Sequence, residues 1–248
     1  MRFLRHMLVV AAVAVLVSGV GSVSGQNKAA PDEKAAAATA NLVSDLGLAA
    51  QLAEFGRGGL NERDGLSTKT PAPEALVAAG ALLLRTHKLT GGKMGTIADA
   101  PKEGGKAAPA VPLDKQAEAL FDEARAAAGT NSKAVEALIE AAMKRDYDRG
   151  SVNGPSTTTR TLNPGETHTF NFNFYVGQPA AVAMTSTGPA RIQFDLVHAG
   201  NGQSLLSIRG HNANYNWTPI RAKDNVRSFT VTLNNTGARP TTYTLTKN

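Results

Sequence analysis

Phenylalanine recurs at every second position of the segment Thr167–Phe174, as Phe170, Phe172 and Phe174, with polar residues between. Successive side chains of a β-strand point to opposite faces of a sheet, so this period of two places the three rings on one face. We therefore predict a β-strand here with one side against a hydrophobic core. The rest of the C-terminal region follows the same pattern.

Further strands are predicted between this segment and the C-terminus. Glycine, proline and asparagine separate them at short intervals, and Asn-Gly at 201–202 is a preferred pair for a hairpin turn. The predicted strands are Ala181–Thr185, Arg191–His198, Ser204–Arg209, Ser228–Leu233 and Thr241–Thr246. Short strands with regular turn signals predict an antiparallel β-sandwich over residues 151–248.

Several short strings in this region match a known pattern. They are Pro164-Gly165-Glu166, Gly177-Gln178, Asp195-Leu196, Asn201-Gly202 and Tyr243-Thr244-Leu245. With them, residues 157–247 resemble the bacterial pre-peptidase C-terminal domain family, whose members are small jelly-roll-like β-sandwiches commonly appended to secreted peptidases. The resemblance implies a jelly-roll-like fold and an accessory role. The residues ahead of it do not resemble a peptidase.

The resemblance also bears on metal binding. Family members often carry two aspartates across the central strand, whereas this chain has Gln193 at the first place and Asp195 at the second. A hard cation such as Ca²⁺ takes several oxygen ligands, usually including more than one carboxylate. We therefore predict no metal site, and no motif in the chain predicts a cofactor.

The residues ahead of the sandwich follow a helical period instead. Apolar residues recur three and four apart, as in Leu46, Ala49 and Ala53, so residues 41–150 are predicted to form a small α-helical array. Residues 89–112 are rich in glycine and proline and predict a long loop within it.

Two similar strings, at 74–79 and 136–141, suggest that the array holds two copies of a helical hairpin. The alternative is that alanine-rich helices resemble each other by composition alone. Residues 75–84 are uniformly apolar and predict the buried helix of the array. The predicted fold class is thus α+β with several domains, a helical array followed by a jelly-roll-like antiparallel β-sandwich.

The first residues carry a processing signal. Arg2 and Arg5 precede the apolar run Met7–Val17, and small residues follow, so residues 1–25 are predicted to be a signal peptide. The run is too short for a membrane-spanning helix, so we expect no stable membrane span after cleavage. Residues 26–40 predict a disordered leader. The chain has no cysteine, which excludes disulfides and a lipid-attachment cysteine. We expect a secreted, periplasmic or cell-surface protein.

The sequence carries no common catalytic or nucleotide-binding motif. It lacks His-Glu-x-x-His, Gly-x-Ser-x-Gly and a P-loop. His168 and His198 are predicted to face solvent from their strands. An enzyme that uses His211 with Asp224 or Glu166 is the weakest of the alternatives, and we predict no catalytic residue.

Candidate binding residues cluster near one polar, aromatic stretch, Gly210–Asn216, which we interpret as a loop. They are His211, Tyr215, Trp217, Arg209, Arg221 and Lys223. Aromatic rings offer faces to sugars and peptides, and cations favour an anionic partner. Residues 151–248 contain eight Lys and Arg against three Asp and Glu, a net charge of +5. Two alternatives stay open: Trp217 plugs the sandwich core, and the basic surface has no specific ligand.

These observations predict a non-catalytic exported protein whose β-sandwich binds a surface partner or stabilises its neighbour. The partner is a protein or an anionic polysaccharide at the cell surface, and no nucleic acid is expected. The alternative function is an accessory or regulatory partner of a secreted hydrolase that docks through the helical half. Neither the ligand nor the oligomeric state follows from the sequence.

Overall fold

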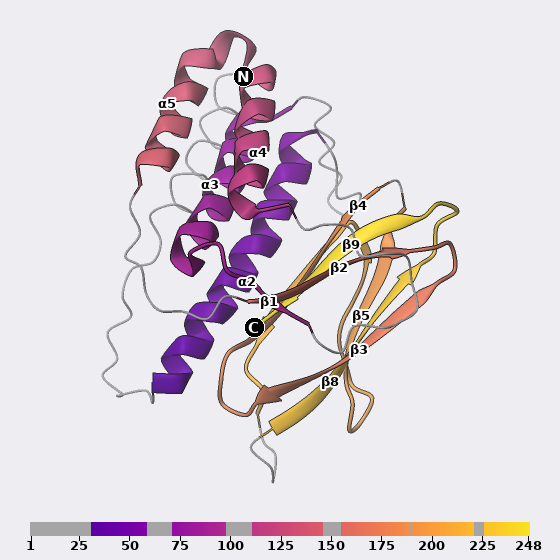
Figure 1. Cartoon of the computed structure of the whole chain (residues 1–248). Coiled ribbons are helices and arrows are strands. Elements are labelled where there is room, and N and C mark those ends of the chain that lie inside the picture. Colours follow the sequence, from indigo (N-terminus) through magenta and orange to yellow (C-terminus); the bar gives the residue numbers. More distant parts are fainter. Residues whose placement is uncertain (1–30, 59–70, 98–110, 146–154, 189, 221–225) are drawn as a thin grey trace, which may run out of the picture.

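A computed structural model of the protein describes residues 31–58, 71–97, 111–145, 155–188, 190–220 and 226–248. The helical half lies against one sheet of a C-terminal β-sandwich, as Figure 1 shows. The predicted fold class, helices followed by a two-sheet antiparallel sandwich, is therefore confirmed. The predicted signal peptide over residues 1–25 lies outside the described residues, and export remains a prediction.

Helix α3 is the centre of the helical half. The helices are α2 (Pro31–Gly56), α3 (Pro73–Thr90), α4 (Leu113–Ala127) and α5 (Ser132–Lys144), with a 3-10 turn at Gly129–Asn131. Helix α3 contacts the other three and buries ten of its residues, in agreement with the apolar run at 75–84. It begins at Pro73, where a missing N–H is tolerated, and ends before Gly91, whose φ of 60° is left-handed. None of the described helices has an apolar run that could span a bilayer.

Helix α2 begins earlier than the sequence indicated. The disordered leader predicted over residues 26–40 is wrong for residues 31–40, which are helical. Alanine-rich polar segments suit a helix as well as a disordered chain, and isolated helices are marginal in water. Here Ala40 and Val43 are buried against Ala181 and Ala183 of the sandwich. That tertiary contact stabilises the helix.

One ion pair is largely buried where α2 meets α3. Oδ2 of Asp45 lies 3.1 Å from Nη1 of Arg85 but accepts no aligned hydrogen bond. Burial raises the pKa of Asp45 to about 6, and the charge of Arg85 offsets only part of the rise. The ionised carboxylate therefore weakens the fold at neutral pH, because the folded protein holds its proton more tightly than the unfolded chain does.

The sandwich consists of two sheets with the strand orders β1-β2-β9-β4-β7 and β3-β8-β5-β6. All pairs are antiparallel except β1 with β2. The strands are β1 (Gly95–Thr96), β2 (Ser156–Leu162), β3 (Thr167–Tyr175), β4 (Ala180–Thr187), β5 (Ile192–His198), β6 (Ser204–Gly210), β7 (Asn212–Trp217), β8 (Val226–Asn235) and β9 (Thr241–Lys247). The predicted strands all form, and three that were not predicted are added: β1, β2 and β7.

The alternating phenylalanines form the centre of the sandwich core. Phe170, Phe172 and Phe174 are 0%, 3% and 5% exposed, and they pack with side chains from both sheets. The helical half also contributes to this core. Its Ile97, which follows the short strand β1, is buried among the same residues. The loop predicted over 89–112 is thus partly a strand that attaches the helical half to the sandwich, and residues 98–110 lie outside the described part.

Candidate binding site at the helix–sandwich seam

Helix α2 lies across the outer face of the first sheet, over β4 and β7 (Figure 1). We call this contact the seam. Its apolar part is small: Ala40 and Val43 of α2 meet Ala181 and Ala183 of β4. Short side chains on both sides allow a helix and a sheet to approach closely.

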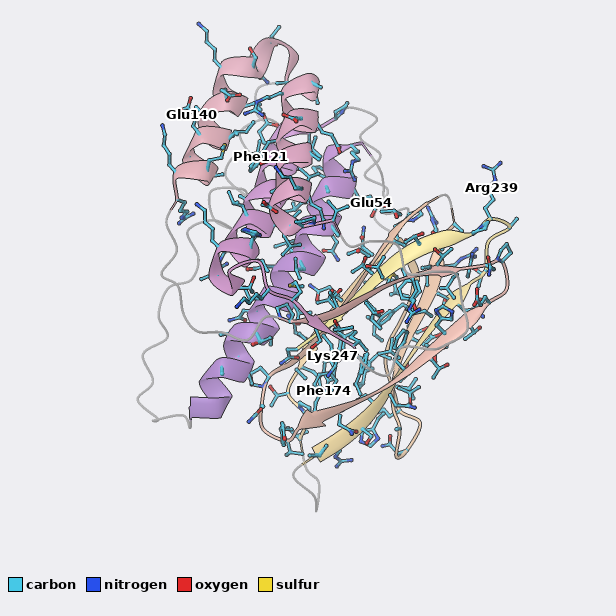
Figure 2. The ribbon with its side chains drawn as sticks, viewed as in Figure 1. Glu54, Phe121, Glu140, Phe174, Arg239 and Lys247 are labelled. Atoms are coloured by element: carbon cyan, nitrogen blue, oxygen red, sulfur yellow. The ribbon has the colours of Figure 1, made fainter. Side chains whose placement is uncertain are left out.

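The polar part of the seam is an asparagine at every second residue of β7. The Nδ2 atoms of these asparagines donate to α2: Asn212 to the carboxylate of Glu54, Asn214 to the carbonyl oxygen of Ser44 at 3.3 Å, and Asn216 to Oγ of Ser44 at 2.6 Å. In Figure 2, Glu54 lies where the helices meet the sandwich. The stretch interpreted as a ligand-binding loop is therefore an edge strand whose polar face is docked on a helix.

The opposite face of β7 carries the aromatic residues. Tyr215 and Trp217 are half-buried and pack against the sandwich core. The ring centroid of Trp217 lies 5.1 Å from those of Phe174 and Phe229, in edge-to-face geometry. The ammonium group of Lys247 lies 5.7 Å from the ring centroid of Phe174, and Figure 2 shows the two residues side by side. A cation thus adjoins the aromatic cluster at this end of the sandwich.

The other predicted site residues are not gathered around Trp217. His211 lies between β6 and β7, and its carbonyl oxygen accepts a hydrogen bond from the backbone N–H of Ser186. Arg209 is exposed on β6 in the second sheet, opposite Gln193. Arg221 and Lys223 lie outside the described residues. The prediction that Arg209 lies beside Trp217, which rested on their closeness in the sequence, is therefore wrong, because the chain changes sheet between β6 and β7.

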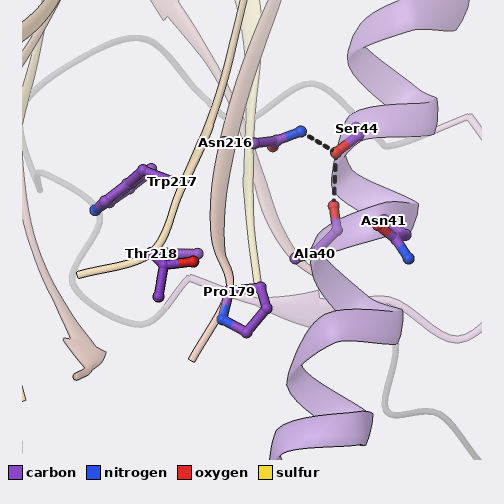
Figure 3. A pocket seen from close by; sticks show the side chains of 8 residues that line it. Ala40, Asn41, Ser44, Pro179, Asn216, Trp217 and Thr218 are labelled. Atoms are coloured by element: carbon purple, nitrogen blue, oxygen red, sulfur yellow. Dashed lines mark hydrogen bonds between the residues drawn. The ribbon is translucent and has the colours of Figure 1, made fainter. Parts of the chain in front are cut away.

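A hollow of about 220 Å³ opens at the seam beside Trp217 (Figure 3). Helix α2, the start of β4 and the end of β7 line it with Ala40, Asn41, Ser44, Pro179, Ala180, Asn216, Trp217 and Thr218. These described lining residues carry no formal charge: the polar ones are amides and hydroxyls, and the apolar ones are two alanines, Pro179 and Trp217, whose ring also packs on the sandwich core. Ser44 is already engaged, since its hydroxyl donates to the carbonyl oxygen of Ala40 at 2.9 Å and accepts from Asn216.

Sequence reasoning found Trp217 but missed the helical wall of this hollow. A signal was present: Ala40, Ser44 and Gly47 recur at helical spacing, and small residues in such a row let a helix approach a partner closely.

One cluster of titratable side chains is buried inside the sandwich. His168 was predicted to face solvent, and this is wrong, since it is 2% exposed. It shares the even-numbered face of β3 with the phenylalanines, so their alternation already assigned it to the core. Its Nδ1 lies 2.7 Å from Oη of Tyr243 and its Nε2 lies 3.0 Å from Glu166. Burial raises the pKa of Tyr243, so its hydroxyl stays protonated.

This cluster fastens the turn before β3 to the sandwich. The pKa of Glu166 is lowered, first by the hydrogen bond that its carboxylate accepts from the backbone N–H of Asn163. Asn235, which is fully buried, donates to the carbonyl oxygens of Leu162 and Arg239. Because Glu166 bonds to His168, it is engaged away from His211, with which an enzymatic role had been considered. No group of three metal-ligating side chains exists within the described ranges.

No protein-family model matches the chain, and no curated protein matches it. Among solved structures it is similar to the pre-peptidase C-terminal domain of a collagenase from Bacillus anthracis, with 16% identity over 38% of this chain and 89% of that one at a TM-score of 0.31. It is also similar to the periplasmic inhibitor of g-type lysozyme from Aeromonas hydrophila, with 6% identity over 38% of this chain and 86% of that one at 0.26. A third similar structure is TmCBM61 in complex with β-1,4-galactotriose. It is 10% identical over 37% of this chain and 69% of that one, at a TM-score of 0.28. The likeness is one of fold, a β-sandwich.

Proposed function

We propose that this chain is an exported, non-catalytic binding protein that holds a sugar unit of a cell-surface polysaccharide in the seam hollow. The observation that carries the proposal is that Trp217, the chain's single tryptophan, lines the hollow together with Asn41, Asn216 and Thr218. An aromatic residue beside neutral amides and hydroxyls suits a sugar, which has apolar ring faces and a rim of hydroxyl groups. Membership of the pre-peptidase C-terminal domain family is part of this proposal.

The size of the hollow restricts the ligand. Sites for drug-sized molecules enclose roughly 300–1,000 Å³, so a hollow of about 220 Å³ accommodates one monosaccharide-sized unit. A unit within a longer chain fits, since the hollow is open to solvent rather than enclosed. The net charge of +5 on residues 151–248 favours an anionic chain over a neutral one. Lys247 and Arg227, which is paired opposite Phe174, are described cations at this end of the sandwich.

The test uses Trp217 as its own reporter. Neutral dextran and anionic alginate oligosaccharides are titrated into the mature protein, and tryptophan fluorescence is followed. We expect saturable quenching that is stronger for alginate and weakens with added salt. Equal quenching by dextran and alginate would contradict a preference for anionic ligands. No quenching by either probe would contradict binding of these two classes of polysaccharide in the hollow.

Matched substitutions on α2 separate the hollow from the rest of the surface. Asn41→Phe places a ring at the rim of the hollow, and Asn41 is exposed, so the fold should tolerate it. Gln51→Phe makes the same change at an exposed position about 15 Å along the same helix. We expect loss of binding with Asn41→Phe and full binding with Gln51→Phe. Equal binding by both variants would place the ligand elsewhere.

Docking to a secreted hydrolase through the helical half is the second proposal, because α5 exposes apolar side chains. Leu138 and Met143 are 37% and 53% exposed there. If this surface binds a protein, Leu138→Glu should release a hydrolase that co-purifies with the chain, whereas Asn41→Phe should not. The opposite result would favour the seam.

A further inference from the structure

The two sheets of the sandwich end in four edge strands: β1, β7, β3 and β6. An edge strand presents unpaired N–H and C=O groups, which invite another strand, and proteins protect edges by shortness, charge, proline, bulges or a covering element. Three of these four edges carry such protection. Strand β1 has two residues, β7 is docked on α2, and β6 has a register irregularity opposite Leu196 and Val197 as well as the exposed Arg209.

Strand β3 carries none of these features within the described residues. It runs for nine residues, THTFNFNFY, without proline, lysine, arginine, aspartate or glutamate. All nine pair with β8 in one unbroken register, so no bulge twists the edge away. Its buried residues already form the core, while Thr169, Asn171 and Asn173 are exposed and neutral. One side of β3 is thus fully paired with β8. Its other side is an uncharged, regular edge with no strand partner in the described sheet.

The composition of β3 fits a second copy of itself. An antiparallel pair centred on Asn171 sets this residue opposite itself, Thr169 opposite Asn173 and Phe170 opposite Phe172. These central pairs join like with like: amide and hydroxyl groups outside, aromatic rings inside. A slip of one residue would set rings against amides, so the alternation excludes such slips. Asn171 is the middle residue of β3, so centring the pair there brings all nine residues of each strand into the pairing. No charge opposes its equivalent across the two-fold axis, as charged edges would.

We propose that two copies of this chain associate by antiparallel pairing of their β3 strands about a two-fold axis at Asn171. The pairing joins the two β3-β8-β5-β6 sheets into one continuous sheet. A self-complementary patch of this kind closes after two subunits and leaves no further free β3 edge. The seam hollow lies on the other sheet, so dimerisation leaves it accessible.

Sedimentation equilibrium of the mature protein over a range of concentrations tests the association. We expect a dimer for the native sequence and a monomer for Asn171→Lys, which opposes two ammonium groups at the axis. Ser204→Lys adds the same charge at an exposed position on β6, the other edge of the same sheet, and should remain dimeric. Circular dichroism shows that each variant is folded. A monomeric native protein, or an Asn171→Lys variant that still dimerises, would overturn the proposal.

Because the chain has no cysteine, a single introduced cysteine tests the register. Directly opposite Cβ atoms of an antiparallel pair lie about 4.5–5.5 Å apart, close to the separation that a disulfide spans. Mild oxidation should therefore convert Asn171→Cys to a covalent dimer and leave Ser204→Cys monomeric on a non-reducing gel. Crosslinking through Ser204→Cys alone would place the interface at β6 and refute pairing through β3.

Discussion

Replacing Gly47 by alanine tests whether α2 is firmly docked on the sandwich. Gly47 is a buried helical residue that faces Asn214 of β7. An alanine Cβ there would lie 2.7 Å from Cγ and 2.8 Å from Cβ of Asn214, whereas carbon atoms in contact prefer about 3.5–4.0 Å. The Cβ of Asn214 is fixed by the pairing of β7 with β4. Relief therefore requires α2 to move away by on the order of 1 Å.

The magnitude follows from three opposing effects. Alanine in place of a helical glycine stabilises by roughly 0.5–1 kcal/mol. Overpacking costs about 1–3 kcal/mol. Displacement of α2 also weakens the hydrogen bonds from Asn214 and Asn216 to Ser44, each worth about 1 kcal/mol. The sum is a loss of about 2 kcal/mol in the free energy of unfolding.

Equilibrium urea unfolding, followed by Trp217 fluorescence and by helical circular dichroism, measures this loss. The matched control is Gly47→Ala in an Asn214→Gly background, where the obstructing side chain is gone and the penalty should largely disappear. If Gly47→Ala instead stabilised the native background by the helix-propensity term, α2 would not be packed on β7 as described. Separate transitions for the two probes would show that the halves unfold independently.

Three further predictions concern stability. Replacing the half-buried Asp45 by asparagine should stabilise the protein by about 2 kcal/mol at pH 7. The raised pKa accounts for about 3 kcal/mol at about 1.4 kcal/mol per pKa unit, and Arg85 loses its partner, which costs about 1 kcal/mol. The raised pKa lowers native stability as pH rises from about 4 to about 6, so urea unfolding should show the advantage vanish near pH 4. His168→Ala should lower stability by about 3 kcal/mol in the same assay, because it leaves a cavity and the hydroxyl of Tyr243 without this partner; a change below 0.5 kcal/mol would contradict the buried cluster. A fragment that begins at Ser151 lacks the core residue Ile97, so we expect it to melt lower than one that begins at Gly91, and equal midpoints by calorimetry would show that β1 is dispensable.

The periodicity of the sequence determined the two kinds of secondary structure. Phe170, Phe172 and Phe174 mark a strand because the side-chain period of two is a local property of extended backbone. Likewise, the apolar run at 75–84 marks the helix with the most neighbours, since a helix that is apolar all round must be surrounded. Even His168 could have been placed in the core, had the alternation been extended by one more step.

The seam, in contrast, was decided by the tertiary structure. Asn212, Asn214 and Asn216 are polar at every second position, a pattern that reads from sequence as a solvent-exposed or ligand-binding segment. Their partners Ser44 and Glu54 lie more than 150 residues earlier in the chain. An amide has the same sequence signature whether water, a ligand or a helix satisfies it.

Tertiary structure also decided where the candidate binding residues lie relative to one another. Sequence proximity joined Arg209 to Trp217, but a change of sheet between β6 and β7 separates a surface cation from a ring that packs on the core. The sequence determines which residues are able to bind, because that depends on side-chain chemistry. Only the tertiary structure brings Asn41 of α2 to the same hollow as Trp217 and Thr218, because contacts between distant segments depend on how helices and sheets pack and not on the local pattern of either.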